Sequence, residues 1–306
     1  MDLHIKYRPT TLDQVVGQGN AILVLKGYLA TDSVPHVICF TGNAGVGKTT
    51  LARIMANELG ATGMALTEKN LGVHNGIEDI RDLGHQASHR ALGGNNSVFI
   101  LDEFHSITKQ ASQGLLKLFE DCPKHAYFFC CTSQPEKIDK AIRTRMTVIE
   151  LGTVKPSDLE ELLLKVMQAE DKVNEPVAKQ LANAAGGSAR EALVKLGQAI
   201  ASGYAGSVIE ELTTPDVEKS DRIWLAREMM NQEMPWTRVF GQLKDVTDDE
   251  VESLRWLLLR YAQSCLGSGG TKADQAARVI TAMKSPFFDA KKAGFLANCY
   301  LAHKKK

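Results

Sequence analysis

Residues 41–49 read Thr41-Gly42-Asn43-Ala44-Gly45-Val46-Gly47-Lys48-Thr49, which matches the phosphate-loop pattern GxxxxGK[ST]. An apolar segment, 36–41, precedes this stretch and an amphipathic segment, 49–59, follows it, as a strand–loop–helix unit requires. Backbone N–H groups of such a loop surround a phosphate at the N-terminus of a helix, where negative charge is favoured. We therefore predict a nucleotide site whose loop residues are Gly42, Asn43, Ala44, Gly45, Val46, Gly47, Lys48, Thr49 and Thr50.

Two acidic residues at the end of a second apolar segment complement the side chains of this loop. We expect Lys48 to reach the β- and γ-phosphate oxygens and the Thr49 hydroxyl to ligate Mg²⁺. The segment Val98–Glu103 is apolar until it ends in Asp102 and Glu103. Because the carboxyl ends of parallel strands open onto the ligand site, Asp102 is predicted to hold a water of the Mg²⁺ shell. Glu103 is predicted to orient and deprotonate the attacking water.

Residues 1–152 alternate short apolar segments with amphipathic ones, which predicts an α/β domain with a doubly wound, five-stranded parallel sheet. The segments 49–59 and 110–120 are predicted to be helices of this domain. The predicted strands are His36–Thr41, Met64–Thr67, Ser97–Asp102, Ala126–Thr132 and Met146–Leu151.

Beyond residue 152 the pattern is entirely helical. Start and stop signals predict helices over 156–169, 174–186 and 188–201, so residues 153–205 form a small helical domain. The segment 202–207 is rich in glycine and serine and is predicted to be a linker, with a larger helical domain over 206–306. In that domain Thr247 and Glu250 form a capping box. Apolar side chains at helical spacing then predict a bundle core, or less readily a partner-binding stripe, at Val251, Leu254, Leu258, Tyr261 and Cys265.

Composition limits the possible functions. The chain of 306 residues has 36 basic and 36 acidic side chains, which disfavours a protein that coats nucleic acid or membranes by bulk charge. A hydrophobic content of 44% excludes dominant disorder. No apolar run approaches the roughly 18 residues of a membrane span, and the first six residues give no secretory signal. The 6 cysteines form no CxxC pair, so we expect reduced thiols, no zinc site and a cytoplasmic protein.

An ordered set of motifs carries a family resemblance over residues 6–195, about two thirds of the chain. They are Lys6-Tyr7-Arg8-Pro9, Val15-Val16-Gly17-Gln18, the phosphate loop, Leu101-Asp102-Glu103-Phe104-His105, Leu115-Leu116-Lys117-Leu118-Phe119-Glu120 and Gly187-Ser188-Ala189-Arg190-Glu191-Ala192-Leu193. This set resembles the AAA+ clamp-loader ATPases, which include the bacterial polymerase III tau/gamma subunit, the small subunits of replication factor C and phage clamp loaders. The resemblance implies an AAA+ domain, a helical lid over 153–205 and a helical collar over 206–306 through which subunits oligomerise.

The resemblance also implies site residues. Thr132 corresponds to the sensor that contacts the γ-phosphate or the lytic water, and Arg190 to the lid arginine that reaches the nucleotide of its own chain. Arg145 corresponds to the arginine finger supplied to a neighbour's ATP, with Arg143 as the competitor for that role. The adenine pocket would be formed by Tyr7, Arg8, Pro9, Val15, Val16, Gly17 and Gln18.

For the whole assembly, the resemblance implies ATP with Mg²⁺, a ring of five subunits, a sliding clamp and primer–template DNA, and no membrane. DNA phosphates would meet helix N-termini together with Asn75, Arg81, Ser106, Thr108 and Lys109. ATP binding would hold the clamp open, and hydrolysis would release it closed on DNA. The host would be a bacterial or phage-infected cell. The bacterial tau/gamma subunit has zinc-binding cysteines after its phosphate-loop helix, whereas Asn57–Thr67 has none, which brings the chain nearer to replication factor C or phage loaders. The alternatives are another AAA+ motor, such as a branch-migration helicase, and a structural loader subunit.

Overall fold

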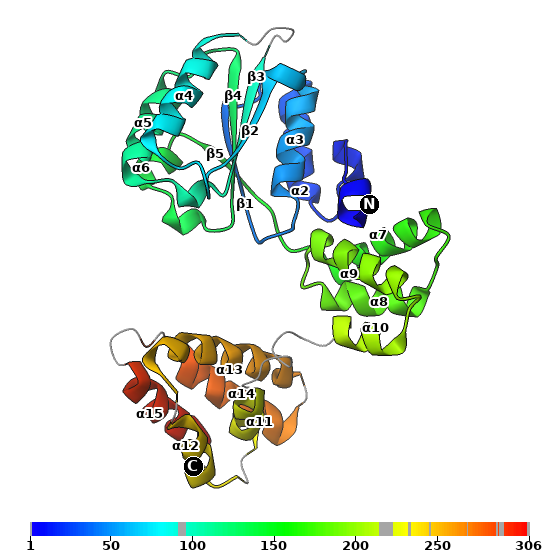
Figure 1. Ribbon diagram of the computed structural model, residues 1–306, viewed down its shortest axis with the longest axis vertical. Coiled ribbons are helices and arrows are strands. Elements are labelled where there is room, and N and C mark those ends of the chain that lie inside the picture. Colours follow the sequence, from blue (N-terminus) through cyan, green and yellow to red (C-terminus); the bar gives the residue numbers. More distant parts are fainter. Residues whose placement is uncertain are drawn as a thin grey trace. The chain divides into compact units, whose positions relative to one another are not determined.

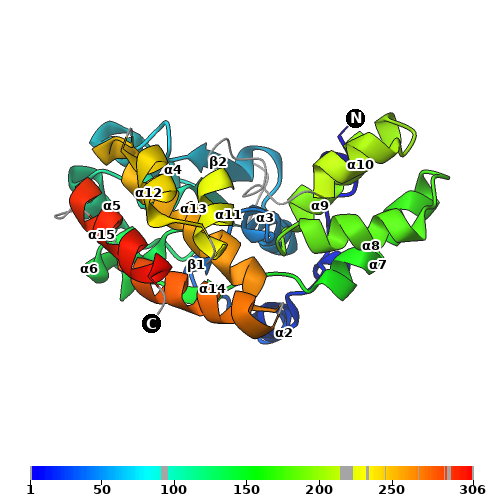
Figure 2. The same ribbon diagram turned by 90° about the horizontal axis from the view of Figure 1, so that it is seen from below.

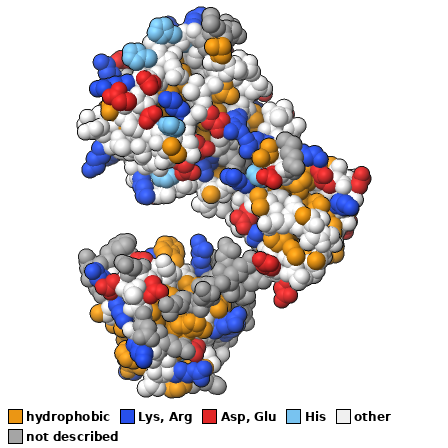
Figure 3. Space-filling model, viewed as in Figure 1, with side chains coloured by type: hydrophobic (Ala, Val, Ile, Leu, Met, Phe, Trp, Pro, Cys, Tyr) orange, Lys and Arg blue, Asp and Glu red, His pale blue; other side chains and the backbone are white. Residues whose placement is uncertain are grey.

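The computed structural model describes residues 2–90, 96–213, 223–231, 234–244, 246–267, 269–285, 287 and 291–304. The chain divides into two compact units, Met1–Thr213 and Thr214–Lys306. Within the described ranges, no helix is both long enough and apolar enough to span a membrane. On the face drawn in Figure 3, basic and acidic side chains are intermixed over the α/β part, in keeping with the zero formal net charge.

The first unit is built on a 5-stranded parallel sheet with the order β2-β3-β4-β1-β5. This confirms the predicted α/β class and the parallel sheet. Thr41, the last residue of β1, pairs with Thr132, the last residue of β4, so the strand ends that carry the site lie side by side. The strands are β1 Val37–Thr41, β2 Leu66–Asn70, β3 Ser97–Asp102, β4 Ala126–Thr132 and β5 Thr147–Glu150.

Helices cover both faces of this sheet, as expected for a doubly wound fold (Figure 1). Because side chains alternate along β1, Ile38 and Phe40 join one buried core while Val37 and Cys39 join the other. The first core is closed by α2 Gly19–Ala30 and α3 Lys48–Glu58. The second is closed by α4 Ile77–Ser88, α5 Lys109–Glu120 and α6 Lys140–Arg143.

Strand β2 lies later in the chain than predicted. Met64 belongs to a 3-10 turn, Gly63–Ala65, and the strand runs from Leu66 to Asn70. Its second half is polar because β2 is an edge strand that pairs with β3 alone and faces solvent on its other edge. Arg53 of α3 donates two hydrogen bonds to Glu68, at 2.9 and 2.7 Å, which accommodates this charge on the strand. A prediction based on apolar runs ends too early at such a strand.

Four helices form a second group within the first unit (Figure 2). Asn174 and Ser188 are the predicted N-caps, and their side chains accept hydrogen bonds from Val177 N (3.3 Å) and Glu191 N (3.1 Å). The helices bury their apolar faces in one core of their own. They are α7 Pro156–Ala169, α8 Glu175–Ala184, α9 Ala189–Ala201 and α10 Gly206–Thr213.

Helix α10 was assigned from sequence to the C-terminal domain, but it packs on α8 and α9. Ile209 is buried in the core of this helical group, and Lys195 Nζ donates to Leu212 O (3.0 Å) and to Ala184 O (2.9 Å). The boundary between the two units therefore falls between Thr213 and Thr214 rather than before Gly206. The predicted linker forms the turn that leads into α10.

The second unit is a helical bundle. The predicted capping box is present, with Thr247 N donating to Glu250 Oε2 at 2.9 Å. The predicted stripe on α13 lies in the bundle core, and buried Gln275 donates to Met229 O (2.8 Å) and Ala302 O (3.0 Å). The helices are α11 Ile223–Met230, α12 Trp236–Leu243, α13 Val251–Leu266, α14 Gly270–Met283 and α15 Lys291–His303.

Candidate active site

The phosphate loop joins β1 to α3 at the carboxyl end of the sheet. Gly47 is the N-cap of α3 with φ +110°, a conformation that residues with a Cβ rarely adopt. Among the described residues other than its chain neighbours, no atom lies within 4 Å of the position that a Cβ would take there. The backbone N–H groups of the first turn of a helix favour a bound anion. The strand–loop–helix unit that the sequence predicts is present.

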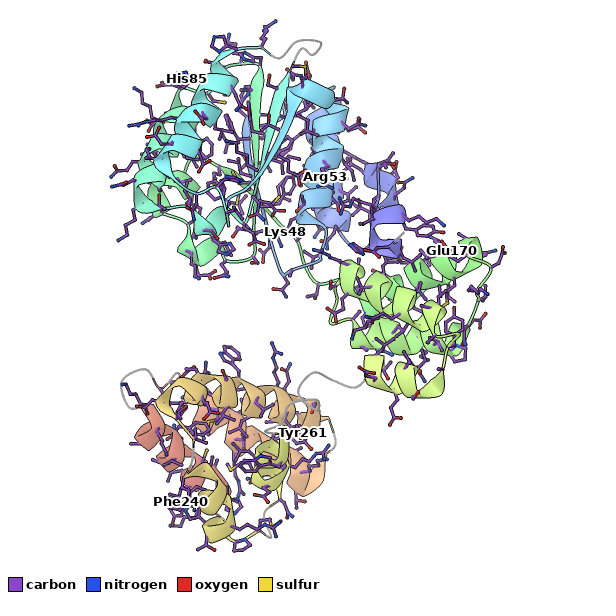
Figure 4. The ribbon with its side chains drawn as sticks, viewed as in Figure 1. Lys48, Arg53, His85, Glu170, Phe240 and Tyr261 are labelled. Atoms are coloured by element: carbon purple, nitrogen blue, oxygen red, sulfur yellow. The ribbon has the colours of Figure 1, made fainter. Side chains whose placement is uncertain are left out.

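Lys48 lies over the loop that precedes it. Its Nζ donates to Gly42 O at 2.9 Å and to Asn43 O at 2.8 Å. Burial lowers the pKa of Lys48, and the nearby Asp102 and Glu103 carboxylates oppose that shift. In Figure 4 Lys48 lies at the end of the sheet that is nearer to α7–α9. A lysine ammonium beside the phosphate loop is available to phosphate oxygens of a bound nucleotide.

Thr49 and Asp102, the predicted Mg²⁺ residues, are in direct contact. The Thr49 hydroxyl donates to Asp102 Oδ2 at 2.8 Å, and Asp102 Oδ1 accepts from Glu103 N at 3.0 Å. A hydroxyl and a carboxylate are hard oxygen donors, and Mg²⁺ in proteins is held by one or two such groups together with substrate phosphates. The part of the chain that the structure describes has no group of three or more His, Cys, Asp or Glu residues placed to hold a metal. The hydroxyl and carboxylate oxygens of the pair fit a Mg²⁺ ion that is shared with a nucleotide.

Glu103 belongs to a polar group that also contains the predicted sensor. The Thr132 hydroxyl lies 3.1 Å from His105 Nδ1, and the same nitrogen lies 3.5 Å from Glu103 Oε2. Gln134 completes the group, with its backbone N donating to Thr132 Oγ1 (3.0 Å) and its amide Nε2 lying 3.3 Å from His105 Nε2. Sequence reasoning assigned no role to His105 or Gln134. The signal for His105 was its place two residues after Glu103, close to the end of β3.

The start of α9 reaches the phosphate loop. Arg190 N donates to Gly45 O at 3.4 Å, and a Cβ on Gly45 would lie only 2.1 Å from Ser188 Oγ. The Arg190 guanidinium is exposed and makes no hydrogen bond or ion pair to any residue in the described part of the chain. The structure therefore brings this predicted lid arginine beside the loop of its own chain.

The predicted adenine-pocket segment connects the loop to the lid helices. Buried Gln18 donates to Val46 O (3.3 Å) and to Gly152 O (2.8 Å). Val15 packs on the core of the sheet, whereas Tyr7 and Val16 pack on the core of α7–α10. Tyr7 OH donates to Glu170 Oε1 at 2.6 Å. Hydrogen bonds from Lys6 and Tyr7 lower the pKa of Glu170, which favours the carboxylate that they share.

Arg145 does not join this site. It stands two residues before β5, which runs parallel to β1, so it lies at the amino end of these strands, whereas the phosphate loop follows the carboxyl end of β1. Its Nε donates to Glu120 Oε1 at 2.7 Å and its Nη1 to Ala141 O at 2.7 Å. Arg143 donates to Pro135 O at 3.0 Å. Neither arginine has a contact with the loop of its own chain among the described residues.

The two segments predicted to meet DNA lie together at the N-termini of α4 and α5. Asn75 Nδ2 donates to Ser106 O at 3.2 Å, and Thr108 Oγ1 donates to Asn75 O at 3.2 Å. Thr108 also caps α5 by accepting from Ala111 N, and Lys109 is exposed. Arg81 is paired with Glu78 at 2.5 Å. Two neighbouring helix starts with exposed polar side chains are suited to phosphate contact.

Residues 38–153 match the model of the ATPase family associated with various cellular activities (AAA). The chain carries an AAA ATPase domain. This domain contains the phosphate loop, the Thr49–Asp102 pair, Glu103 and Thr132. The resemblance that the sequence motifs predicted is thereby confirmed for this part of the chain.

Curated relatives extend the likeness beyond the AAA domain. The chain is 32% identical over 220 residues to the DNA polymerase III subunit tau of Escherichia coli, covering 65% of this chain and 34% of the relative. It is 30% identical over 225 residues to the DNA polymerase III subunit gamma/tau of Mycobacterium tuberculosis, covering 66% and 39%. The chain thus spans between a third and two fifths of the length of these relatives.

Solved structures of RuvB from Thermotoga maritima are similar in fold to this chain. One RuvB variant has a TM-score of 0.60 at 18% identity over 81% of this chain and 88% of that chain. The RuvB Holliday junction branch migration motor has a TM-score of 0.58 at 18% identity over 76% and 80%. At this level of identity the likeness concerns the fold alone.

Proposed function

We propose that this chain is an ATPase subunit of a DNA-replication clamp loader, working in the cytoplasm of a bacterial or phage-infected cell. The observation that carries the ATPase role is the contact between the Thr49 hydroxyl and the Asp102 carboxylate, with Glu103 as the next residue. The likeness to DNA polymerase III subunit tau supports the replication role.

The residues of this chain divide the work of hydrolysis among them. The loop N–H groups and Lys48 bind the phosphates of ATP, and the segment 7–18 binds the adenine. Thr49 and Asp102 would hold Mg²⁺, which when bound neutralises phosphate charge. Glu103 removes a proton from the attacking water, and Thr132 fixes that water or the γ-phosphate by a hydrogen bond. Arg190 couples the angle of the lid to the γ-phosphate.

The position of Arg145 supports assembly into a ring of five subunits. Since the arginine lies at the end of the strands opposite its own phosphate loop, it serves a neighbouring subunit, where it stabilises charge on the transferred phosphoryl group. Each site is then completed by the next chain. ATP binding orders the ring that holds an open sliding clamp, and hydrolysis releases the closed clamp.

Primer–template DNA enters the ring along the N-termini of α4 and α5. The contacts of Asn75 with Ser106 and Thr108 keep these two helix starts together. Contacts of this kind bind phosphates without reading bases. A purely structural loader subunit is disfavoured because the residues proposed to carry out hydrolysis are all present at their motif positions. They are Lys48, Thr49, Asp102 and Glu103. The alternative of a branch-migration motor has only the fold of RuvB in its favour.

The proposal is tested by the ATPase rate of the assembled loader with primed DNA and the cognate clamp, each alone and both together. We expect strong stimulation only when DNA and clamp are both present. Stimulation by DNA alone, accompanied by strand displacement, would contradict a loader and favour a DNA motor. No hydrolysis under any condition would contradict the ATPase role itself.

A further inference from the structure

His105 is fixed between the predicted catalytic carboxylate and the predicted sensor. It belongs to the 3-10 turn Phe104–Ser106, which is anchored by the fully buried Phe104 ring and closed by the hydrogen bond from Ser106 N to Glu103 O at 2.9 Å. Only 12% of the His105 side chain is exposed. The imidazole is therefore held in place by the fold before any ligand binds.

The contacts of the ring determine which nitrogen carries the proton. Nδ1 faces two oxygens, Thr132 Oγ1 at 3.1 Å and Glu103 Oε2 at 3.5 Å. A carboxylate can only accept hydrogen bonds, so a proton on Nδ1 satisfies this side of the ring. Nε2 faces the amide Nε2 of Gln134 at 3.3 Å, which can only donate. Together these contacts fit a neutral imidazole with its hydrogen on Nδ1.

This arrangement sets the direction of the Thr132 hydroxyl. Its oxygen accepts one hydrogen bond from Gln134 N at 3.0 Å and a second from His105 Nδ1 at 3.1 Å. A hydroxyl oxygen has two lone pairs, and these two hydrogen bonds use both of them. Any further hydrogen bond of Thr132 must therefore be one that its own hydrogen donates. The γ-phosphate oxygens of ATP are acceptors, and the sensor hydroxyl is therefore oriented to donate to them.

We propose that His105 is a positioning residue for ATP hydrolysis, whose Nδ1–H keeps Thr132 in its donor orientation while the ring lies beside the Glu103 carboxylate, 3.5 Å from Oε2. This inference rests on the proposed ATPase function. Without the imidazole, Thr132 is free to donate to Glu103 instead, which would turn both groups away from the reacting phosphate. His105 acts only through these two residues and does not itself touch ATP.

Substitutions can separate this role from simple packing. The amide nitrogen of Asn occupies the place of Nδ1, whereas that of Gln occupies the place of Nε2. We expect His105→Ala and His105→Gln to lower single-turnover hydrolysis in the assembled loader roughly tenfold to a hundredfold at unchanged ATP affinity. His105→Asn should restore most of the rate. Equal rates for the Asn and Gln variants, or a wild-type rate for the Ala variant, would overturn the proposal.

His85→Ala is the matched control, because this exposed histidine lies on α4 at the end of the α/β part away from Lys48 (Figure 4). Its rate should equal that of the wild type. An inactive wild-type loader would contradict the proposed function, whereas an active wild type with an equally active His105→Ala variant would contradict the role of His105 alone. Thermal unfolding of each variant identifies any that does not fold.

The tautomer of His105 offers a test that needs no activity. Nitrogen-15 NMR of histidine-labelled wild-type protein distinguishes Nδ1–H from Nε2–H, and the His105→Asn variant identifies the resonance by its loss. We expect the Nδ1–H form in the nucleotide-free protein. An Nε2–H form would mean that the Thr132 hydroxyl donates to the ring, which would overturn the proposed orientation of the sensor.

Discussion

The two acids at the end of β3 are adjacent in the chain but have different surroundings. Asp102 continues the strand, and both of its oxygens accept hydrogen bonds, one from Thr49 and one from Glu103 N. Glu103 has a left-handed backbone with φ +51°, so its side chain leaves the direction of the strand and remains half exposed. One carboxylate is therefore placed to hold an ion and the other to meet a water.

Replacing Glu103 by Gln tests this division of roles. The amide keeps the shape of the side chain but cannot take a proton from water. We expect Glu103→Gln to bind ATP with wild-type affinity and to lose about 10²- to 10⁴-fold in turnover. Fluorescent-nucleotide titration and single-turnover hydrolysis measure the two effects. Glu58→Gln, an exposed residue at the end of α3, is the control and should change neither.

Site residues that belong to short sequence motifs could be predicted from the sequence. Lys48, Thr49 and Asp102 belong to this class, and the structure brings Thr49 and Asp102 into contact. His105 and its partners do not, since the imidazole contacts Thr132 and Gln134 across separations of 27 and 29 residues. Such a contact arises only when β3 and β4 are paired, and a single sequence gives no register for that pairing.

At the scale of elements, the N-terminus of α9 contacts the phosphate loop. Its N-cap Ser188 was predictable because a capping residue follows directly after two glycines. The contact of Ser188 with Gly45 was not, because it depends on how α7–α9 pack beside the sheet. For the same reason the sequence assigned α10 to the wrong domain: an amphipathic helix after a glycine-rich turn gives no indication of which core will bury it.

Gly45→Ala tests whether this contact matters for nucleotide binding. Gly45 has φ +76°, where a Cβ costs about 1–2 kcal/mol, and that Cβ would also meet Ser188 Oγ at 2.1 Å. Gly60 at the end of α3 has nearly the same φ, +74°, with no atom within 4 Å, so Gly60→Ala is the matched control. We expect both variants to lose stability in thermal unfolding but only Gly45→Ala to weaken ATP binding.

A second substitution separates the lid contact from strain in the loop itself. Ser188→Ala removes the oxygen that the new Cβ would strike. In the Gly45→Ala background it should recover part of the lost ATP affinity, although by itself it removes the cap of α9 and costs about 1 kcal/mol of stability. Unchanged affinity on adding Ser188→Ala would mean that the loop strain alone is responsible.

For the whole molecule, the zero formal net charge does not argue against DNA binding by a ring of subunits. A single chain that grips DNA by bulk charge needs an excess of basic residues, and this chain has 36 of each sign. A ring subunit needs only a few inward phosphate contacts, which are multiplied by the number of copies. The polar starts of α4 and α5 can supply such contacts without a net positive surface.

The proposed sharing of active sites between neighbouring subunits gives a prediction for the assembly. If Arg145 completes the site of a neighbour, Arg145→Ala should leave ATP binding intact, since the arginine has no contact with its own loop among the described residues. In mixtures with wild-type chain, the DNA- and clamp-stimulated ATPase rate should fall by more than the mutant fraction, because each mutant subunit disables a site on another chain.

Arg143→Ala provides the comparison, because this arginine lies two residues away and its side chain bonds only to Pro135 O among the described residues. In mixtures with wild-type chain, Arg143→Ala should lower the ATPase rate only in proportion to the mutant fraction, or leave it unchanged. A linear decline with Arg145→Ala would mean that each chain works with its own residues. A steep decline with Arg143→Ala instead would assign the arginine finger to Arg143. It would still support a ring, because a defective chain can inactivate the site of another chain only if the two share that site.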